Sequence, residues 1–154
     1  MSLSIGDKAP DFTMPATGGR VVSLESLKGK PFVLYFYPRA DTPGCTKEAC
    51  AFQDGLPDFA KRDVTVIGIS KDSMKALEKF AEKYSLTFPL ASDPDTAVIN
   101  AYGAWGKKSL YGRKYMGIER STVLVDAAGK VAKLWPKVKV AGHAEDVLKA
   151  MQAL

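Results

Sequence analysis

The residues of this sequence best suited to chemistry are two cysteines, Cys45 and Cys50, which lie five positions apart. Cys45 follows a Thr-Pro-Gly sequence that begins at Thr42, and these residue types favour the start of a helix. We therefore expect Cys45 in the first helical turn, where free backbone N–H groups stabilise an anion. Because the thiolate is the reactive form of cysteine, this position indicates a nucleophile.

A helix start alone is too weak to keep a thiol ionised, since it stabilises an anion by only about 0.3–1 kcal/mol. A guanidinium beside the sulfur would contribute roughly 1–4 kcal/mol. We expect Arg120 to supply it, because Arg120 immediately precedes the apolar run Ser121–Val125, which can pair with the run that ends at Tyr37. Arg39 is nearer in sequence but would more easily point into solvent.

Two other kinds of cysteine site are not expected. Two cysteines are too few for a framework of structural disulfides, and a bridge between them would close a very short loop. Zinc takes about four ligands, whereas the chain adds only His143, far away in sequence, to its two cysteines. We therefore expect no metal and no cofactor.

The strands that must position these residues are indicated by short apolar runs rich in β-branched or aromatic residues. They are predicted at Pro31–Tyr37, at Val64–Ser70, and at Ser121–Val125 and Val131–Trp135, which form a hairpin with Gly129 in its turn.

Three helices are predicted between and after these strands. The first begins at about Thr42 or Pro43 and is broken or kinked near Gly55 and Pro57. The second follows a cap at Asp72 or Ser73 and buries one apolar face, which consists of Met74, Leu77, Phe80, Ala81 and Tyr84. The third begins at about Ala144 and turns Val147, Leu148, Met151 and Leu154 toward the core.

This order predicts an α/β fold of the thioredoxin-like sandwich type, with a central mixed sheet flanked by helices. An N-terminal extension precedes it, and an insertion at about residues 86–120 precedes the last hairpin. Another small α/β sandwich with the same order of elements remains open. The length of 154 residues fits a single domain, residues 1–154.

The net charge of +5 is uneven, because residues 1–103 carry −1 and residues 104–154 carry +6. The basic stretch Lys107–Lys114 is interpreted as a solvated loop rather than a nucleic-acid surface. The charged residues Asp7 and Lys8 interrupt the N-terminal segment, and no run approaches the roughly 20 apolar residues of a membrane span. A cytoplasmic protein with no membrane or nucleic-acid partner is expected.

The segment around Cys45 resembles a known family. The pattern Pro38-x-x-x-Thr42-x-x-Cys45 is similar to the active-site signature of peroxiredoxins, and the string from Asp41 to Cys50 resembles their Q-type, or bacterioferritin-comigratory, subfamily. The similarity extends from Gly6 to Thr122. The resemblance implies that Cys45 attacks peroxide.

For the neighbours of Cys45, the resemblance implies that Thr42 hydrogen-bonds the peroxide, that Pro38 shields the site, and that Arg120 holds thiolate and peroxide together. Taken singly, Thr42 also fits a helix cap and Pro38 a strand end. Glu48 fits a favourable charge in the first turn, and within reach of Arg120 it would instead orient the guanidinium at some cost to the thiolate.

Attack on peroxide would leave a sulfenic acid on Cys45, and Cys50 is the other thiol of the chain. Five helical residues separate two Cα atoms by about 8–9 Å, whereas a disulfide tolerates about 7 Å. An internal disulfide therefore requires the helix to unwind, with Gly44, Gly55 and Pro57 as places for that change. The alternative is an inert Cys50 and an external resolving thiol.

The sequence thus predicts a thiol-dependent peroxidase for hydrogen peroxide and small organic hydroperoxides. The resemblance implies thioredoxin or glutaredoxin as the reductant and favours a monomer, and the basic stretch Lys107–Lys114 would guide an acidic reductant. Two alternatives are a thioredoxin-type disulfide oxidoreductase, which would use a Cys-x-x-Cys pair, and a peroxide-sensing redox module.

Overall fold

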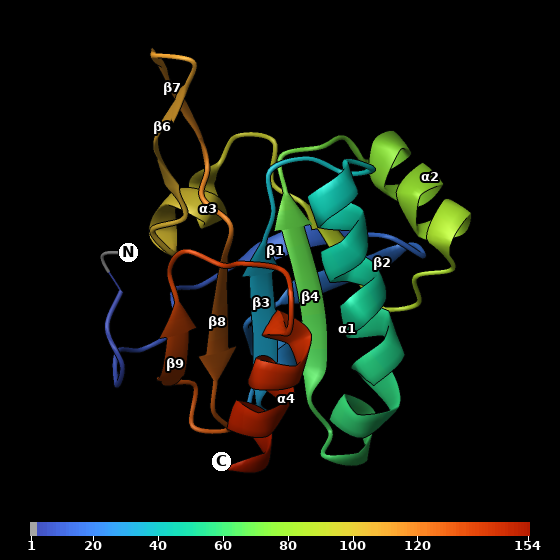
Figure 1. Ribbon diagram of the computed structural model, residues 1–154. Coiled ribbons are helices and arrows are strands. Elements are labelled where there is room, and N and C mark those ends of the chain that lie inside the picture. Colours follow the sequence, from blue (N-terminus) through green and yellow to red (C-terminus); the bar gives the residue numbers. More distant parts are fainter. Residues whose placement is uncertain (1–2) are drawn as a thin grey trace.

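Residues 3–154, which the computed structural model describes, form a mixed sheet of seven strands in the order β2-β1-β5-β4-β3-β8-β9, seen in Figure 1. The strands are β1 (Thr13–Ala16), β2 (Arg20–Ser23), β3 (Phe32–Phe36), β4 (Thr65–Ser70), β5 (Leu90–Ser92), β8 (Ser121–Val125) and β9 (Val131–Trp135). The central pair β3 and β4 is parallel, and β8 and β9 form the expected antiparallel hairpin. The thioredoxin-like α/β prediction is confirmed.

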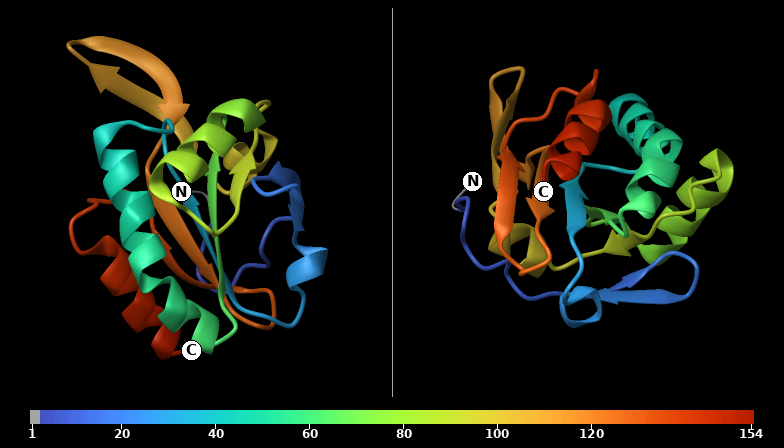
Figure 2. Two further views of the ribbon diagram at one scale, coloured as in Figure 1. Left: turned by 90° about the vertical axis from the view of Figure 1, so that its right-hand side faces the viewer. Right: turned by 90° about the horizontal axis from the view of Figure 1, so that it is seen from below.

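Both faces of the sheet are covered, which explains why every residue of β3 and β8 is buried. Helices α1 (Pro43–Lys61), α2 (Met74–Tyr84) and α4 (His143–Gln152) pack on one face, against Val33 and Tyr35. The short helix α3 (Ala97–Ala101) and the N-terminal segments cover the other, where Leu34 and Phe36 point. A 3-10 turn (Glu25–Leu27) follows β2. Figure 2 shows helices α1, α2 and α4 on one side of the sheet and the N-terminal segments on the other.

The expectation of a break in the first helix is wrong, because α1 runs without interruption through Gly55 and Pro57, while the alternative of a kink there stays a prediction. Phe52 and Phe59, on either side of Pro57, are both fully buried. Packing of these rings holds the helix together where local propensity alone would end it.

At the ends of the other two predicted helices, Ser73 is the cap of α2, and its hydroxyl accepts a hydrogen bond from the N–H of Ala76. Val147 and Met151 of α4 are buried as expected. The expectation for Leu154 is wrong, since α4 ends at Gln152 and Leu154 is exposed.

The insertion at residues 86–120 holds more structure than the sequence predicts. Its first part adds β5 to the sheet, and its last part is a separate hairpin of β6 (Trp105–Leu110) and β7 (Arg113–Ile118), joined at Tyr111 and Gly112. Both turn residues have positive φ, which is typical of the tight turns of hairpins. The interpretation of Lys107–Lys114 as a loop is therefore wrong.

Candidate active site

Cys45 lies in the first turn of α1, which begins at Pro43 after a loop that follows the carboxyl end of β3 at Phe36. Its side chain is 1% exposed and packs with Tyr35, Tyr37 and Ala49. The helix cap, Thr42, makes no side-chain bond to the helix N-terminus. The N–H groups of Gly44 and Cys45, which lack intrahelical acceptors, are therefore free to stabilise a negative charge at the sulfur.

The Arg120 guanidinium reaches this sulfur from the neighbouring strand. Nη2 of Arg120 donates to Sγ of Cys45 at 3.2 Å. The sheet explains the approach, because β8 runs antiparallel to β3 and places Ser121 opposite Phe36, at the end of β3 from which α1 departs. The expected contact is present, whereas the side chain of Arg39 is exposed.

Glu48, one turn beyond Cys45, binds the other arm of the same guanidinium. Nη1 of Arg120 lies 2.7 Å from Oε1 of Glu48, and the two side chains are 18% and 1% exposed. Burial raises the pKa of Glu48 to about 7, although Arg120 acts in the opposite direction. Glu48 therefore both orients the guanidinium and competes with the sulfur for its charge.

Gly44 allows the guanidinium to lie this close to the helix. A Cβ atom at Gly44 would stand 3.3 Å from Nη2 of Arg120, which is tighter than ordinary contact. Sequence reasoning missed this role, because glycine beside a helix start indicates a turn, and only the three-dimensional approach of Arg120 reveals the contact.

Thr42 and Pro38 lie on the loop between β3 and α1. The Thr42 hydroxyl donates to the carbonyl oxygen of Arg39 at 2.9 Å, so its own oxygen remains able to accept a hydrogen bond. Pro38 is half-buried. The structure thus places Thr42 at the helix start and Pro38 in the loop that leads to it, and their catalytic roles remain predictions.

The same loop is tied to α2 and to the end of β4. Asp41 has a φ of 60°, a strained value for a residue with a side chain. Its carboxylate accepts from Nζ of Lys83 at 2.9 Å and from the hydroxyl of Tyr84 at 2.8 Å. The N–H of Ala40 donates to Asp72 at 2.8 Å. These bonds hold the loop in place around Cys45.

Cys50 is half-buried on α1, and both cysteines are free thiols. Burial, and secondly the charge of Asp54, raises the pKa of the Cys50 thiol. The uninterrupted helix holds the two cysteines beyond the span of a disulfide.

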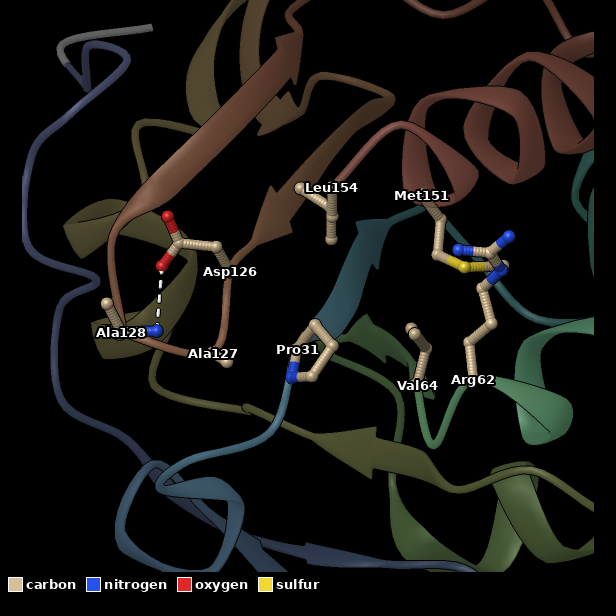
Figure 3. Close-up of a pocket in the computed structure, with 8 residues that line it drawn as sticks. All are labelled: Pro31, Arg62, Val64, Asp126, Ala127, Ala128, Met151 and Leu154. Atoms are coloured by element: carbon tan, nitrogen blue, oxygen red, sulfur yellow. Dashed lines mark hydrogen bonds between the residues drawn. The ribbon is translucent and has the colours of Figure 1, made fainter.

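A cavity of about 670 Å³ lies at the opposite end of the sheet from Cys45, as its lining by Pro31, Arg62 and Leu154 indicates. Figure 3 shows these residues around it, and none of the predicted site residues contributes. Within the described residues 3–154, no cluster of His, Cys, Asp or Glu side chains is arranged to hold a metal ion. No helix in that range is long and apolar enough to cross a membrane.

Comparison with known proteins agrees with this geometry. A model of the AhpC/TSA family matches residues 5–134. The chain belongs to the AhpC/TSA family. Among its relatives in the peroxiredoxin branch, peroxiredoxin Bcp of Bacillus subtilis is 45% identical over 152 residues, covering 99% of this chain and 97% of the relative.

Solved peroxiredoxin structures share the fold over nearly the whole chain. A cysteine-to-serine mutant of Xylella fastidiosa PrxQ has a TM-score of 0.93 at 36% identity, covering 99% of this chain and 98% of that one. The bacterioferritin comigratory protein of Xanthomonas campestris has a TM-score of 0.90 at 40% identity, covering 99% and 97%. The resemblance to the Q-type peroxiredoxins is thus confirmed.

Proposed function

We propose that this chain is a thiol-dependent peroxidase in which Cys45 attacks the peroxide. The contact that carries this proposal is the 3.2 Å bond from Arg120 to the buried Cys45 sulfur at the start of α1. A guanidinium and free helix N–H groups around one sulfur favour a thiolate and a departing oxygen anion alike. The Xanthomonas campestris relative is described for its alkyl peroxide reduction activity, which supports organic hydroperoxides as substrates.

In the first step, the thiolate electron pair of Cys45 forms a bond to the terminal peroxide oxygen and the O–O bond breaks. The other oxygen leaves as an alkoxide or hydroxide and takes up a proton, and Cys45 becomes a sulfenic acid. Arg120 and the N–H groups of Gly44 and Cys45 stabilise the charge on the leaving oxygen. The Thr42 hydroxyl oxygen accepts a hydrogen bond from the peroxide through its free lone pairs, and Pro38 limits access of water.

In the second step, the thiolate of Cys50 attacks the sulfenic sulfur, and hydroxide leaves as water. This step requires α1 to unwind around both cysteines, because the helix holds them too far apart. Unwinding also removes Cys50 from the surroundings that raise its pKa. A dithiol protein such as thioredoxin or glutaredoxin would then reduce the disulfide. We also propose a single-domain, monomeric, cytoplasmic enzyme.

Peroxide consumption coupled to NADPH through thioredoxin and its reductase tests this function. Cys45→Ser should abolish turnover, while Cys50→Ser should keep a single turnover and lose recycling through thioredoxin. The mass of the intact protein after one equivalent of peroxide separates the two resolving routes: loss of two hydrogens indicates the internal disulfide, and gain of one oxygen indicates a stable sulfenic acid. Full activity of Cys45→Ser would contradict the proposal.

A further inference from the structure

The β6–β7 hairpin stands clear of the sheet (Figures 1 and 2). Tyr111 at its tip is 97% exposed and Tyr115 is 46% exposed. Tyrosine is enriched in protein interfaces, because one side chain offers both apolar area and a polar group. Tyrosines on a projecting arm therefore indicate a contact surface.

The hairpin is also strongly basic. Residues 105–118 carry four cations, Lys107, Lys108, Arg113 and Lys114, and no acidic residue. Two copies of this hairpin would therefore repel one another, whereas an acidic surface would be attracted.

One face of the hairpin borders Arg120 through Lys108. Lys108 pairs with Tyr115, and Leu110 pairs with Arg113, so Lys108, Arg113 and Tyr115 share a face. Lys108 also lines a shallow groove of about 240 Å³ together with Arg120, Lys137 and Lys139, in which four cations outnumber a single acidic residue, Glu119. We call Lys108, Arg113, Tyr115, Lys137 and Lys139 the basic hairpin face.

This face is close enough to Cys45 to meet a protein that works on the same sulfur. Two residues after β7 ends, Arg120 contacts Cys45. The hairpin leaves the body at the end of the sheet where α1 begins, as Figure 1 shows. Its six-residue strands extend about 17 Å, which matches the radius of an interface that buries about 800 Å² on each partner.

From these observations we propose that the basic hairpin face docks the protein dithiol that reduces the Cys45–Cys50 disulfide, through an acidic surface around the partner's cysteines. This inference rests on the proposed function. In the reaction, one partner thiolate attacks a sulfur of the disulfide and releases the other cysteine as a thiol. The second partner thiolate then displaces this chain from the mixed disulfide, so that two electrons and two protons pass to Cys45 and Cys50.

The test compares two double variants that change the hairpin equally on opposite faces. Arg113→Glu with Tyr115→Ser alters the basic hairpin face. Lys114→Glu with Met116→Ser makes the same change of charge and similar polarity on the other face. Each variant is assayed for peroxide turnover with an acidic thioredoxin and, separately, with dithiothreitol, which needs no docking surface.

The first variant should raise the KM for thioredoxin about tenfold or more, with turnover on dithiothreitol unchanged. The second should stay within about twofold on both reductants. Equal effects of the two variants, no effect of either, or loss of turnover on dithiothreitol in the first variant alone would overturn the inference.

Two further measurements decide between other occupants of the face. The inference would also be overturned if the wild type forms a dimer that Arg113→Glu with Tyr115→Ser abolishes. Tight binding of an oligonucleotide that the same double variant abolishes would overturn it as well. If the wild type fails to turn over peroxide even with dithiothreitol, the proposed peroxidase function itself fails.

Discussion

Gly44 sets how closely the Arg120 guanidinium approaches the helix that carries Cys45. Adding one methyl group at Gly44 would force Nη2 of Arg120 outward by a few tenths of an ångström. That shift lengthens the 3.2 Å bond to the sulfur. The proposed chemistry therefore depends on a residue with no side chain of its own.

We expect Gly44→Ala to slow the reaction of Cys45 with peroxide by roughly three- to tenfold, because small misplacements of a catalytic group are costly. Stopped-flow measurement of the first step, made without a reductant, isolates this effect. The fold should be retained, since alanine favours a helix.

The matched control is Gly55→Ala in the same helix. A Cβ atom there would meet the ring of Phe59 at an ordinary 3.6 Å. This substitution should leave the peroxide rate unchanged and stabilise the protein by about 0.5–1 kcal/mol. Equal peroxide rates in the two variants would show that the Arg120 contact tolerates displacement.

Single residues also show what a sequence can reveal about the site. Arg120 could be predicted, because it precedes a strand whose pairing with β3 fixes where it lies. For Glu48 the sequence left open whether it orients Arg120, and the role of Gly44 was missed, because both depend on where the Arg120 side chain lies and not on strand pairing alone.

Among the elements, strands that coincide with an apolar run were predictable from the sequence, whereas the β6–β7 hairpin and the continuity of α1 were not. The strands β3, β4, β8 and β9 follow apolar runs, and the sequence places them within a residue or two. The hairpin β6–β7 was missed because only Trp105 and Ile118 at its base pack against the core and its lysines conceal any alternation. The continuity of α1 was missed because it depends on tertiary burial of Phe52 and Phe59.

The loop between β3 and α1 holds the start of α1 in its helical form through Asp41. Lys83 and Tyr84 bind this carboxylate and lower the pKa of Asp41. Because Asp41 has a strained backbone conformation, loss of these bonds favours release of the loop. Release is the motion that the proposed disulfide requires.

We therefore expect the combination of Lys83→Met and Tyr84→Phe to speed formation of the Cys45–Cys50 disulfide, on the order of twofold to fivefold, since exposed ion pairs are weak. Faster resolution should also reduce over-oxidation of Cys45 to sulfinic acid under excess peroxide. Quenched-flow mass spectrometry measures both products.

Lys79→Met on α2 is the control, because Lys79 is exposed on the same helix and makes none of the bonds to Asp41. It should leave both products at wild-type levels. A slower disulfide in the double variant would mean that the contacts of Asp41 assist the motion instead of restraining it.

At the scale of the whole molecule, the sequence indicates the central β4-β3-β8-β9 order but not the rest of the sheet. Strand β5 has three residues, Leu90–Ser92, and its pairing with β1 involves one register position, Ala16 opposite Ala91. Such short pairings have no pattern of their own. They form because the two faces of the sheet close around them.

Two buried titratable groups make the stability of the whole fold depend on pH in opposite directions. Glu48, with a pKa of about 7 against an ordinary 4.5, keeps its proton in the folded chain where the unfolded chain has lost it. Its contribution to stability is complete below about pH 4.5 and is lost as the pH rises through 7.

His143 acts in the other direction. Its ring is buried, with Nε2 2.7 Å from the Thr122 hydroxyl, and burial lowers its pKa from 6.5 to about 4. The unfolded chain binds a proton below pH 6.5 where the folded chain does not, so stability falls as the pH drops from 6.5 to 4. Each group contributes on the order of 1–3 kcal/mol at full effect.

Between about pH 4.5 and 6.5 the two effects should nearly cancel, and replacing either residue should reveal the other. In Glu48→Gln, the free energy of unfolding in urea should rise with pH across this window, because the opposing response of Glu48 is gone and that of His143 remains. In His143→Gln, which keeps a nitrogen for Thr122, the free energy of unfolding should fall with rising pH, because the response of His143 is gone and that of Glu48 remains. If the free energy of unfolding changes with pH in the same way in both variants, these side chains titrate alike in the folded and unfolded chain. Arg120 would then hold Glu48 ionised throughout.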